Sequence, residues 1–158
     1  FRRSLPMSLL KAREAVMNNF IPHLRENDLS PQQWRVLRAL FDCVEAGEGE
    51  LEMTVLAERC FLLLPSLSRI VQNLETRQLI LRRTSESDQR RSIISITSAG
   101  IALVELMAPQ SEARYQHITE VFGFGKLELL YELLDELTAK LSEADEEGAS
   151  GLDGGDTH

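Results

Sequence analysis

Two groups of polar and basic side chains lie close together in the middle of the chain. The first group follows one side of a predicted helix and consists of Ser66, Ser68, Arg69, Gln72 and Asn73. Side chains of these types form hydrogen bonds with base edges in DNA: Asn and Gln suit adenine, Arg suits guanine, and Ser accepts several partners. We therefore predict a base-reading surface on this helix. An ordinary solvated polar face is the alternative.

The second group is a cluster of arginines in the polar stretch that follows this helix. It contains Arg82, Arg83, Arg90 and Arg91, with Asp88 among them. An arginine that enters a narrow minor groove meets an enhanced negative potential, and we assign this role to Arg90. Asp88 is expected to hold Arg90 or a neighbouring arginine through a charge-assisted bond. The other three arginines are expected to contact phosphates, and an exposed hairpin with scattered charges is the alternative.

The charge distribution favours a DNA partner, although the net charge does not. The chain of 158 residues carries a formal charge of −8. Residues 54–97 hold seven arginines and four acidic residues, which gives +3, whereas the rest of the chain carries −11. Because binding depends on local charge, we expect this basic segment to bind double-stranded DNA. The acidic total leaves a helical adaptor that binds no DNA as an alternative.

The segments around these groups predict a winged helix-turn-helix. Ser30 and Gln33 have the spacing of a capping box, which starts a helix. Thr54 is expected to cap a short helix ending near residue 60, and a second helix over 65–76 carries the polar group. In residues 79–97 the spacing of the apolar residues changes to that of β-strands, which predicts two strands with a polar turn between them. The predicted fold class is mainly α, with a small β-hairpin wing and a helical dimerisation part.

Both flanks of this unit are predicted to be helical. Apolar residues recur every three or four positions over 5–21, where Pro22 is expected to kink or end the helix. Residues 98–122 form another candidate helix with a kink at Pro109, and a leucine seam follows. These flanks carry more apolar surface than a small winged helix can cover, so we expect a homodimer on a pseudo-palindromic site. A helical cap packed within one chain is the alternative.

The predicted organisation has four parts. The dimerisation helix spans 5–28, the winged helix-turn-helix spans 30–97, and further dimerisation helices span 98–142. The tail, 143–158, is acidic and has few apolar residues, so it is expected to be disordered.

Three local motifs resemble the MarR family of winged-helix transcriptional regulators. They are Leu56-Ala57-Glu58-Arg59, then Ser66-Leu67-Ser68-Arg69 followed by Leu74-Glu75 and Leu79-Ile80, and finally Asp88-Gln89-Arg90 with Ile96-Thr97 and Gly100 downstream. The resemblance covers residues 5 to about 142. It implies a DNA-binding repressor, and a phosphate role for at least part of the contacts of Arg69. Two positions depart from the family, since Cys60-Phe61 and Gln78 stand where glycines are usual.

Two longer stretches are similar to the subgroup that regulates homoprotocatechuate degradation (HpaR). They are 10–15 with Phe20 and Pro22, and 33–38. The family resemblance implies a small aromatic acid, such as a hydroxyphenylacetate, as the effector that releases DNA. The candidate effector residues are Arg13, Met17, His23, Trp34 and Arg38. Arg13 would hold the carboxylate and Trp34 would stack on the ring. Ion pairing of Arg13, core packing of Trp34 and a solvated His23 are the alternatives.

The sequence does not predict an enzyme. Gly123-Phe124-Gly125-Lys126 lacks the spacing of a phosphate loop, and no zinc pattern joins the cysteines to His23, His117 or His158. We therefore expect no metal and no cofactor. Cys43 and Cys60 lie among apolar residues, where inert buried thiols are usual. A redox-sensing regulator that uses Cys43 or Cys60 is the alternative function.

The expected location is the cytoplasm, with the protein at the nucleoid when it is bound to DNA. No apolar segment approaches the ~18–20 residues that cross a membrane, and the first residues lack the apolar core of a signal peptide. Because the chain begins with Phe1 rather than Met, we expect the reading frame to be longer than the sequence.

Overall fold

The structure is a computed structural model that describes residues 3–151. It is mainly helical with one small sheet, as the sequence predicts. The helices are α1 (Leu5–Met17), α2 (Ile21–Glu26), α3 (Pro31–Glu45), α4 (Met53–Cys60), α5 (Leu64–Thr76), α6 (Ser98–Phe122) and α7 (Phe124–Gly151). The strands are β1 (Leu51–Glu52), β2 (Ile80–Thr84) and β3 (Ser92–Ile96). The chain divides into two compact units, one that ends at Arg114 and one that begins at Tyr115.

The start of α3 is fixed by the predicted capping box. The Ser30 side chain accepts a hydrogen bond from the Gln33 backbone N–H at 3.1 Å, and the Gln33 side chain accepts one from the Ser30 backbone N–H at 2.9 Å. Two of the backbone donors that a helix start leaves unpaired are thereby satisfied. Pro31, which has no N–H to lose, occupies the first turn. The prediction for this helix start is confirmed.

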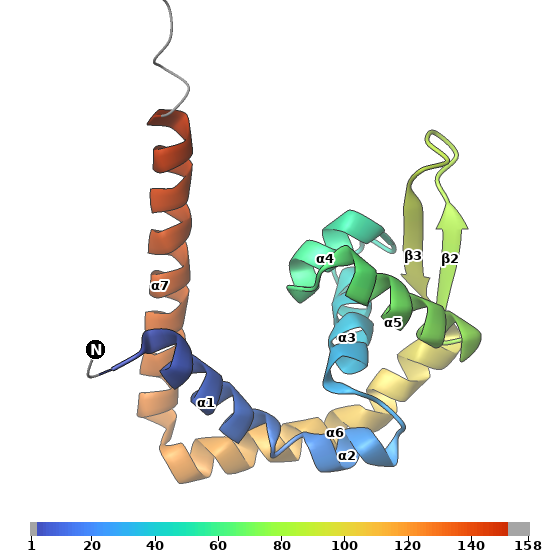
Figure 1. Ribbon diagram of the computed structural model, residues 1–158. Helices are drawn as coiled ribbons and strands as arrows, with labels where there is room; N and C mark the ends of the chain where they lie inside the picture. The colour runs from blue at the N-terminus through green and yellow to red at the C-terminus, as the bar shows by residue number, and fades with distance from the viewer. Residues whose placement is uncertain (1–2, 152–158) are drawn as a thin grey trace, which may run out of the picture. The chain divides into compact units, whose positions relative to one another are not determined.

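The sheet consists of three antiparallel strands in the order β1-β3-β2. Strands β2 and β3 pair from Ile80 with Ile96 to Thr84 with Ser92, and the hairpin that they form stands beside α5 (Figure 1). Strand β1 pairs with β3 on its other side. The sequence did not predict β1, because a strand of two residues has no detectable period.

The core of the first unit lies between the helix-turn-helix and the sheet. Leu37 of α3, Leu56 of α4, Leu67 of α5 and Ile94 of β3 are fully buried. On α5, the buried residues Leu67, Val71 and Leu74 recur at spacings of four and three, which places them on one face. Burial of this face orients α5, so its opposite side must point to solvent.

Two tight turns use left-handed backbone at residues other than glycine. Phe61 ends α4 with a φ of 52°, and Gln78 lies between α5 and β2 with a φ of 60°. These are the two positions where the family usually has glycine. Left-handed backbone costs an ordinary side chain free energy, and around Gln78 the Thr97 hydroxyl compensates by donating to the Gln78 carbonyl at 2.7 Å. The same hydroxyl accepts from the Gly100 N–H at 3.0 Å, which ties the wing to the start of α6.

Two predictions about where helices begin and end are wrong. Thr54 does not cap α4, because the helix already begins at Met53 and Glu52 occupies the N-cap position. Pro22 does not end the first helix; α1 stops at Met17, and Pro22 lies in the first turn of α2, where a proline costs no hydrogen bond. The predicted bounds of the helix over 98–122 are confirmed, since α6 spans Ser98–Phe122 with Pro109 inside it.

The acidic tail is helical as far as the structure describes it. Helix α7 continues to Gly151, so the disorder expected from residue 143 is wrong for 143–151, and 152–158 lie outside the described residues. Alanine and glutamate are good helix formers, and they extend a helix that the preceding leucines have already begun. The low content of apolar residues therefore did not predict the structure of 143–151 correctly. Within residues 3–151, no helix is both long and apolar enough to cross a membrane.

Candidate nucleic-acid interface

The polar group on α5 lies on the exposed side of the helix. Ser66, Ser68, Arg69, Gln72 and Asn73 are all exposed, and the apolar residues of α5 are buried behind them. In the described residues, the side chains of Ser66, Ser68, Arg69 and Gln72 form no hydrogen bond or ion pair. Their donors and acceptors are therefore available to a partner.

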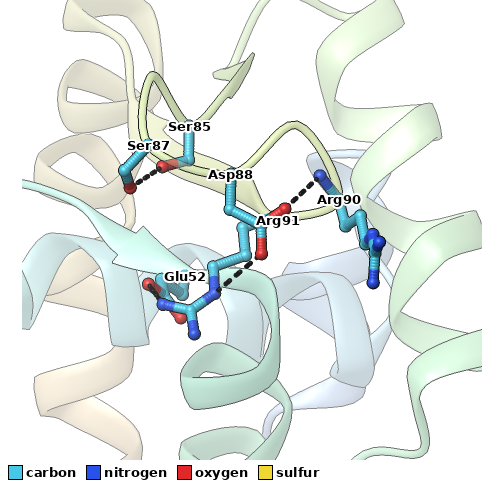
Figure 2. Close-up of polar contacts among 6 residues, drawn as sticks. All are labelled: Glu52, Ser85, Ser87, Asp88, Arg90 and Arg91. Carbon is cyan, nitrogen blue, oxygen red and sulfur yellow. Dashed lines mark hydrogen bonds and ion pairs between the residues drawn. The ribbon is translucent and has the colours of Figure 1, made fainter.

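Asp88 shapes the turn of the wing. Its Oδ1 accepts a hydrogen bond from the backbone N–H of Arg90 at 3.0 Å, and its Oδ2 lies 3.7 Å from Nε of Arg91 (Figure 2). The Asp88 carbonyl also accepts from the Arg91 N–H at 3.0 Å. The carboxylate thus holds the backbone of Arg90 and the side chain of its neighbour, rather than the Arg90 guanidinium.

The Arg90 side chain itself is unrestrained. Figure 2 shows it extending away from Asp88 and Arg91. Within residues 3–151, its guanidinium has no hydrogen-bond or salt-bridge partner. A turn with a fixed backbone and one free guanidinium is a geometry that suits insertion into a groove of negative potential.

One surface cavity joins the wing to α5. Its volume is about 300 Å³, and its lining combines residues of the helix, the wing and the start of α4: Glu52, Met53, Thr54, Leu64, Ser68, Arg82, Arg90, Arg91 and Ser92. Members of the two groups predicted from the sequence therefore share one surface. Three of the four wing arginines lie on this cavity, which makes it strongly basic on one side.

Three glutamates before α4 form ion pairs with arginines of this region. Arg59 binds Glu48 at 2.8 Å, Arg91 binds Glu52 at 3.1 Å, and Arg83 binds Glu50. The hydrogen bonds from Arg59 and Arg83 lower the pKa of Glu48 and of Glu50, respectively. We call Glu48, Glu50 and Glu52 the acidic ladder. The acidic ladder was not predicted from the sequence, although glutamates at every second position are a signal for one face of an extended segment.

The predicted phosphate contacts are thus not equivalent. Arg83 and Arg91 are paired with the acidic ladder, whereas Arg82 donates to the Ser92 hydroxyl at 3.2 and 3.3 Å. A phosphate must replace a carboxylate at Arg83 or Arg91, but at Arg82 it replaces only a neutral hydroxyl.

Asn73 also has a partner inside the protein. Its Oδ1 accepts a hydrogen bond from Nε2 of Gln33 at 2.9 Å. This contact connects the exposed side of α5 to the capping box of α3, forty positions earlier in the chain. The capping box was predicted from the sequence, but its link to α5 was not.

The five candidate effector residues lie on three helices of the first unit. Arg13 and Met17 are on α1, His23 is on α2, and Trp34 and Arg38 are on α3. In the described part of the chain, no hydrogen bond or ion pair joins any two of them. Arg13 pairs with Glu14 at 3.1 Å, and Arg38 pairs with Asp42 at 3.3 Å while lying over the Phe41 ring. Trp34 and Arg38 are half-buried one helical turn apart, so they share a face.

His23 is buried, so the alternative of a solvated side chain after Pro22 is wrong. It is 2% exposed, its Nε2 lies 3.3 Å from the Ser111 hydroxyl of α6, and its Nδ1 has no hydrogen-bond partner among residues 3–151. Burial lowers its pKa, the charge of Arg114 lowers it further, and Glu26 opposes them. The position of His23 directly after Pro22 suggested an exposed residue. His23 is buried instead because it lies on the side of α2 that contacts α6.

Both cysteines are buried free thiols, as expected. Burial raises the pKa of Cys43 and of Cys60, and Sγ of Cys60 lies 3.8 Å from the Arg35 carbonyl. A raised pKa lowers the thiolate fraction that reacts with oxidants. Among residues 3–151, no group of His, Cys, Asp and Glu side chains has the arrangement of a metal site.

Comparison with known proteins agrees with this geometry. The MarR family model matches residues 27–91. The chain is 39% identical to the HTH-type transcriptional regulator FarR of Neisseria gonorrhoeae over 89% of this chain and 92% of that protein. It is 38% identical to the homoprotocatechuate degradative operon repressor of Escherichia coli, over 86% and 88% of the two chains. The crystal structure of NadR with 4-hydroxyphenylacetate is similar at a TM-score of 0.71 and 37% identity, over 85% of this chain and 92% of that one.

The matched model spans α3, both helices of the helix-turn-helix and most of the wing. The similarity to the full-length relatives extends the match to the flanking helices. The name of the Escherichia coli relative also agrees with the subgroup resemblance found in the sequence. This chain belongs to the MarR family, whose members are DNA-binding transcriptional regulators rather than enzymes.

Proposed function

We propose that the protein is a homodimeric repressor of an aromatic-compound degradation operon, and that a small phenolic acid releases it from a pseudo-palindromic operator. The observation that carries the DNA-binding part is the cavity shared by Ser68 of α5 and Arg90 of the wing. In this proposal α5 enters the major groove, and Arg90 enters the adjacent minor groove. Arg82, Arg83 and Arg91 contact phosphates, and Asp88 holds the turn.

Exposed apolar side chains support the dimer. Helix α1 buries none of its residues, and Leu5, Leu9 and Leu10 on it are exposed. Helix α7 exposes Leu130 and Leu134, which belong to the leucine seam. Apolar surface of this extent favours association. A second copy of the chain would cover this apolar surface. It would also supply the second recognition helix that a pseudo-palindrome requires.

Two relatives support the effector class. The Escherichia coli relative is named for the homoprotocatechuate operon, and NadR was solved with 4-hydroxyphenylacetate. We propose that such an acid binds near α1, α2 and α3, with Trp34 against the ring and Arg38 or Arg13 at the carboxylate. Met17 and His23 complete the candidate set. Arg38 is favoured over Arg13 because it is half-buried beside Trp34, although it must exchange Asp42 for the ligand.

The test measures DNA release. A duplex enriched by the protein from a randomised library is labelled, and its binding is followed by fluorescence anisotropy. Addition of 4-hydroxyphenylacetate should lower the affinity, because a ligand that prefers the non-binding state shifts the equilibrium by its differential affinity. The matched alcohol 4-hydroxyphenylethanol, which lacks the carboxylate, should have little effect.

Two variants locate the site. Arg38→Ala should bind the acid more weakly in calorimetry while it still binds DNA. Arg25→Ala removes an exposed arginine of α2 outside the proposed set and serves as the control. Equal affinity of wild type and Arg38→Ala for the acid would remove Arg38 from the proposal.

A further inference from the structure

The side chains of Ser30, Gln33 and Asn73 form a chain of hydrogen bonds with a single direction. The Ser30 backbone N–H donates to Oε1 of Gln33 at 2.9 Å, and Nε2 of Gln33 donates to Oδ1 of Asn73 at 2.9 Å. We call this arrangement the amide relay. It connects the N-cap of α3 to the exposed side of α5.

The direction of the amide relay follows from its first donor. A backbone N–H can only donate, so the Gln33 atom that faces Ser30 must be the oxygen. The nitrogen of Gln33 must then face Asn73, and because this nitrogen only donates, the atom of Asn73 that faces it must be the oxygen. The Nδ2 group of Asn73 is left without a partner among the described residues.

This orientation changes what Asn73 can read. An asparagine pairs with adenine by presenting its oxygen and its nitrogen together to one base edge. Here Gln33 engages one lone pair of Oδ1 and fixes the orientation of the amide, so the group that Asn73 presents without a partner among the described residues is Nδ2, a donor. Guanine, thymine and adenine each offer an acceptor in the major groove, whereas cytosine offers only a donor there. From its residue type alone, without Gln33 as a partner, Asn73 was predicted to pair with adenine.

We propose that Gln33 is a specificity-determining residue that sets Asn73 as a hydrogen-bond donor and thereby excludes cytosine at the base that Asn73 contacts. Gln33 does so without touching DNA. The inference rests on the proposed placement of α5 in the major groove, and the experiment separates the two.

The test reverses the amide relay by one substitution. In Gln33→Glu, the carboxylate still accepts from Ser30, and glutamate suits this position of a capping box. The carboxylate now also accepts from Asn73, so the Asn73 amide must turn and present its oxygen outward. The full-length wild type and variants are each used to enrich duplexes from a randomised library, and Asn73→Ala identifies the base pair at which preference is lost.

At that base pair, wild type should disfavour cytosine, and Gln33→Glu should shift the ratio of cytosine to guanine by about threefold to tenfold toward cytosine. Asn73→Asp, which presents an acceptor at the same place, should shift it in the same direction. Gln32→Glu adds the same charge on the neighbouring exposed residue and should leave the ratio as in wild type. Thermal melting checks that each variant is folded.

Three results would overturn the inference. If Gln33→Glu and Gln32→Glu give the same base preferences, Gln33 does not set Asn73. If Asn73→Ala changes no base pair while DNA is still bound, Asn73 reads no base and only this inference fails. If wild type enriches no sequence, the proposed DNA-binding function fails with it.

Discussion

At the scale of single residues, the arginines of the wing differ in their partners: some form ion pairs within the protein, and one has a guanidinium that is free among the described residues. Arg83 and Arg91 are engaged by the acidic ladder, whereas the guanidinium of Arg90 has no partner in the described residues. A free guanidinium on a fixed backbone loses little internal bonding when it binds, so more of its interaction energy is available for DNA. Arg90 is therefore the wing residue whose removal should affect affinity most.

The variant Arg90→Ala should weaken binding to an enriched duplex by roughly 1–3 kcal/mol and should reduce the salt slope by about one. Its melting temperature should match that of wild type, because the side chain is exposed. Anisotropy titrations at several salt concentrations measure both effects. Arg25→Ala, on α2, is the matched control, and equal losses in the two variants would contradict a specific role for the wing.

Gly100 fixes the contact between the wing and α6. A Cβ atom at this position would lie 2.2 Å from the Leu79 carbonyl oxygen and 2.6 Å from Cγ1 of Ile96. Because the nearer atom belongs to the backbone, it cannot move aside without disturbing the turn. Gly100→Ala should therefore destabilise the fold by about 1–3 kcal/mol.

Chemical denaturation measures this effect. Gly148→Ala is the control, since no atom of the described residues comes within 4 Å of a Cβ atom there and alanine favours a helix. A Gly100→Ala protein as stable as Gly148→Ala would show that the contact does not constrain the wing.

At the scale of elements, the acidic ladder links the segment before α4 to the wing. In the proposed complex, its carboxylates would compete with DNA phosphates for Arg83 and Arg91. The pKa of Glu50 lies below its usual value because Arg83 donates hydrogen bonds to it, so the carboxylate stays charged at neutral pH. We therefore expect the ladder to weaken the proposed phosphate contacts of the wing while it holds the hairpin in place.

The double variant Glu50→Gln and Glu52→Gln should bind DNA more tightly and with a steeper salt dependence, because two arginines are released for phosphates. Titrations of one duplex at increasing salt provide the measurement. Glu45→Gln and Glu58→Gln remove the same charge from α3 and α4 without breaking a ladder pair, and should change affinity less. Lower affinity of the ladder variant would mean that the wing needs the ladder for its geometry.

The packing of α2 on α6 should respond to pH. His23 has a pKa below its ordinary value of 6.5, chiefly because it is buried, so below about pH 6.5 the unfolded chain binds a proton that the folded chain excludes. Stability should therefore fall as pH decreases through that value, until the folded-state pKa is passed. Melting temperatures from pH 5 to 8 test this.

His23→Leu should flatten the pH profile, since leucine fills a buried position and does not titrate. His117→Gln, at an exposed histidine of α6, should keep the wild-type profile. A profile that persists in His23→Leu would assign the titration to another group.

At the scale of the whole molecule, one chain leaves apolar helix faces uncovered. Helix α7 buries none of its described residues, yet leucines recur along it. A dimer that covers these faces also fixes the spacing of its two recognition helices. In the proposed function, operator recognition therefore depends on dimerisation.

Leu130→Glu with Leu134→Glu should give a monomer in light scattering at micromolar concentration and should abolish high-affinity binding to the palindrome. Leu141→Asn, a milder change further along α7, serves as the comparison. A wild-type protein that is itself monomeric would contradict the proposed dimer directly.

Local signals predicted the fold well. The capping box at Ser30 and Gln33 and the change of period after α5 lie within a few neighbouring residues, and both are confirmed. The features that were missed depend on distant partners. Glu50 meets Arg83, and Gln33 meets Asn73, only because the chain folds back on itself, and no local pattern contains that register. The domain boundaries and the DNA and effector contacts remain predictions.

The acidic ladder has a consequence for how such a regulator would search a chromosome. Residues 48–97 contain seven arginines and seven acidic residues, so the charges of this segment cancel once the ladder is included. A DNA-binding protein with a weak nonspecific attraction to phosphate spends less time bound to the large excess of nonspecific sites. In the proposed function, its occupancy of the operator would then depend on the few bases that match, and a modest loss of affinity on binding the effector would be enough to release the DNA.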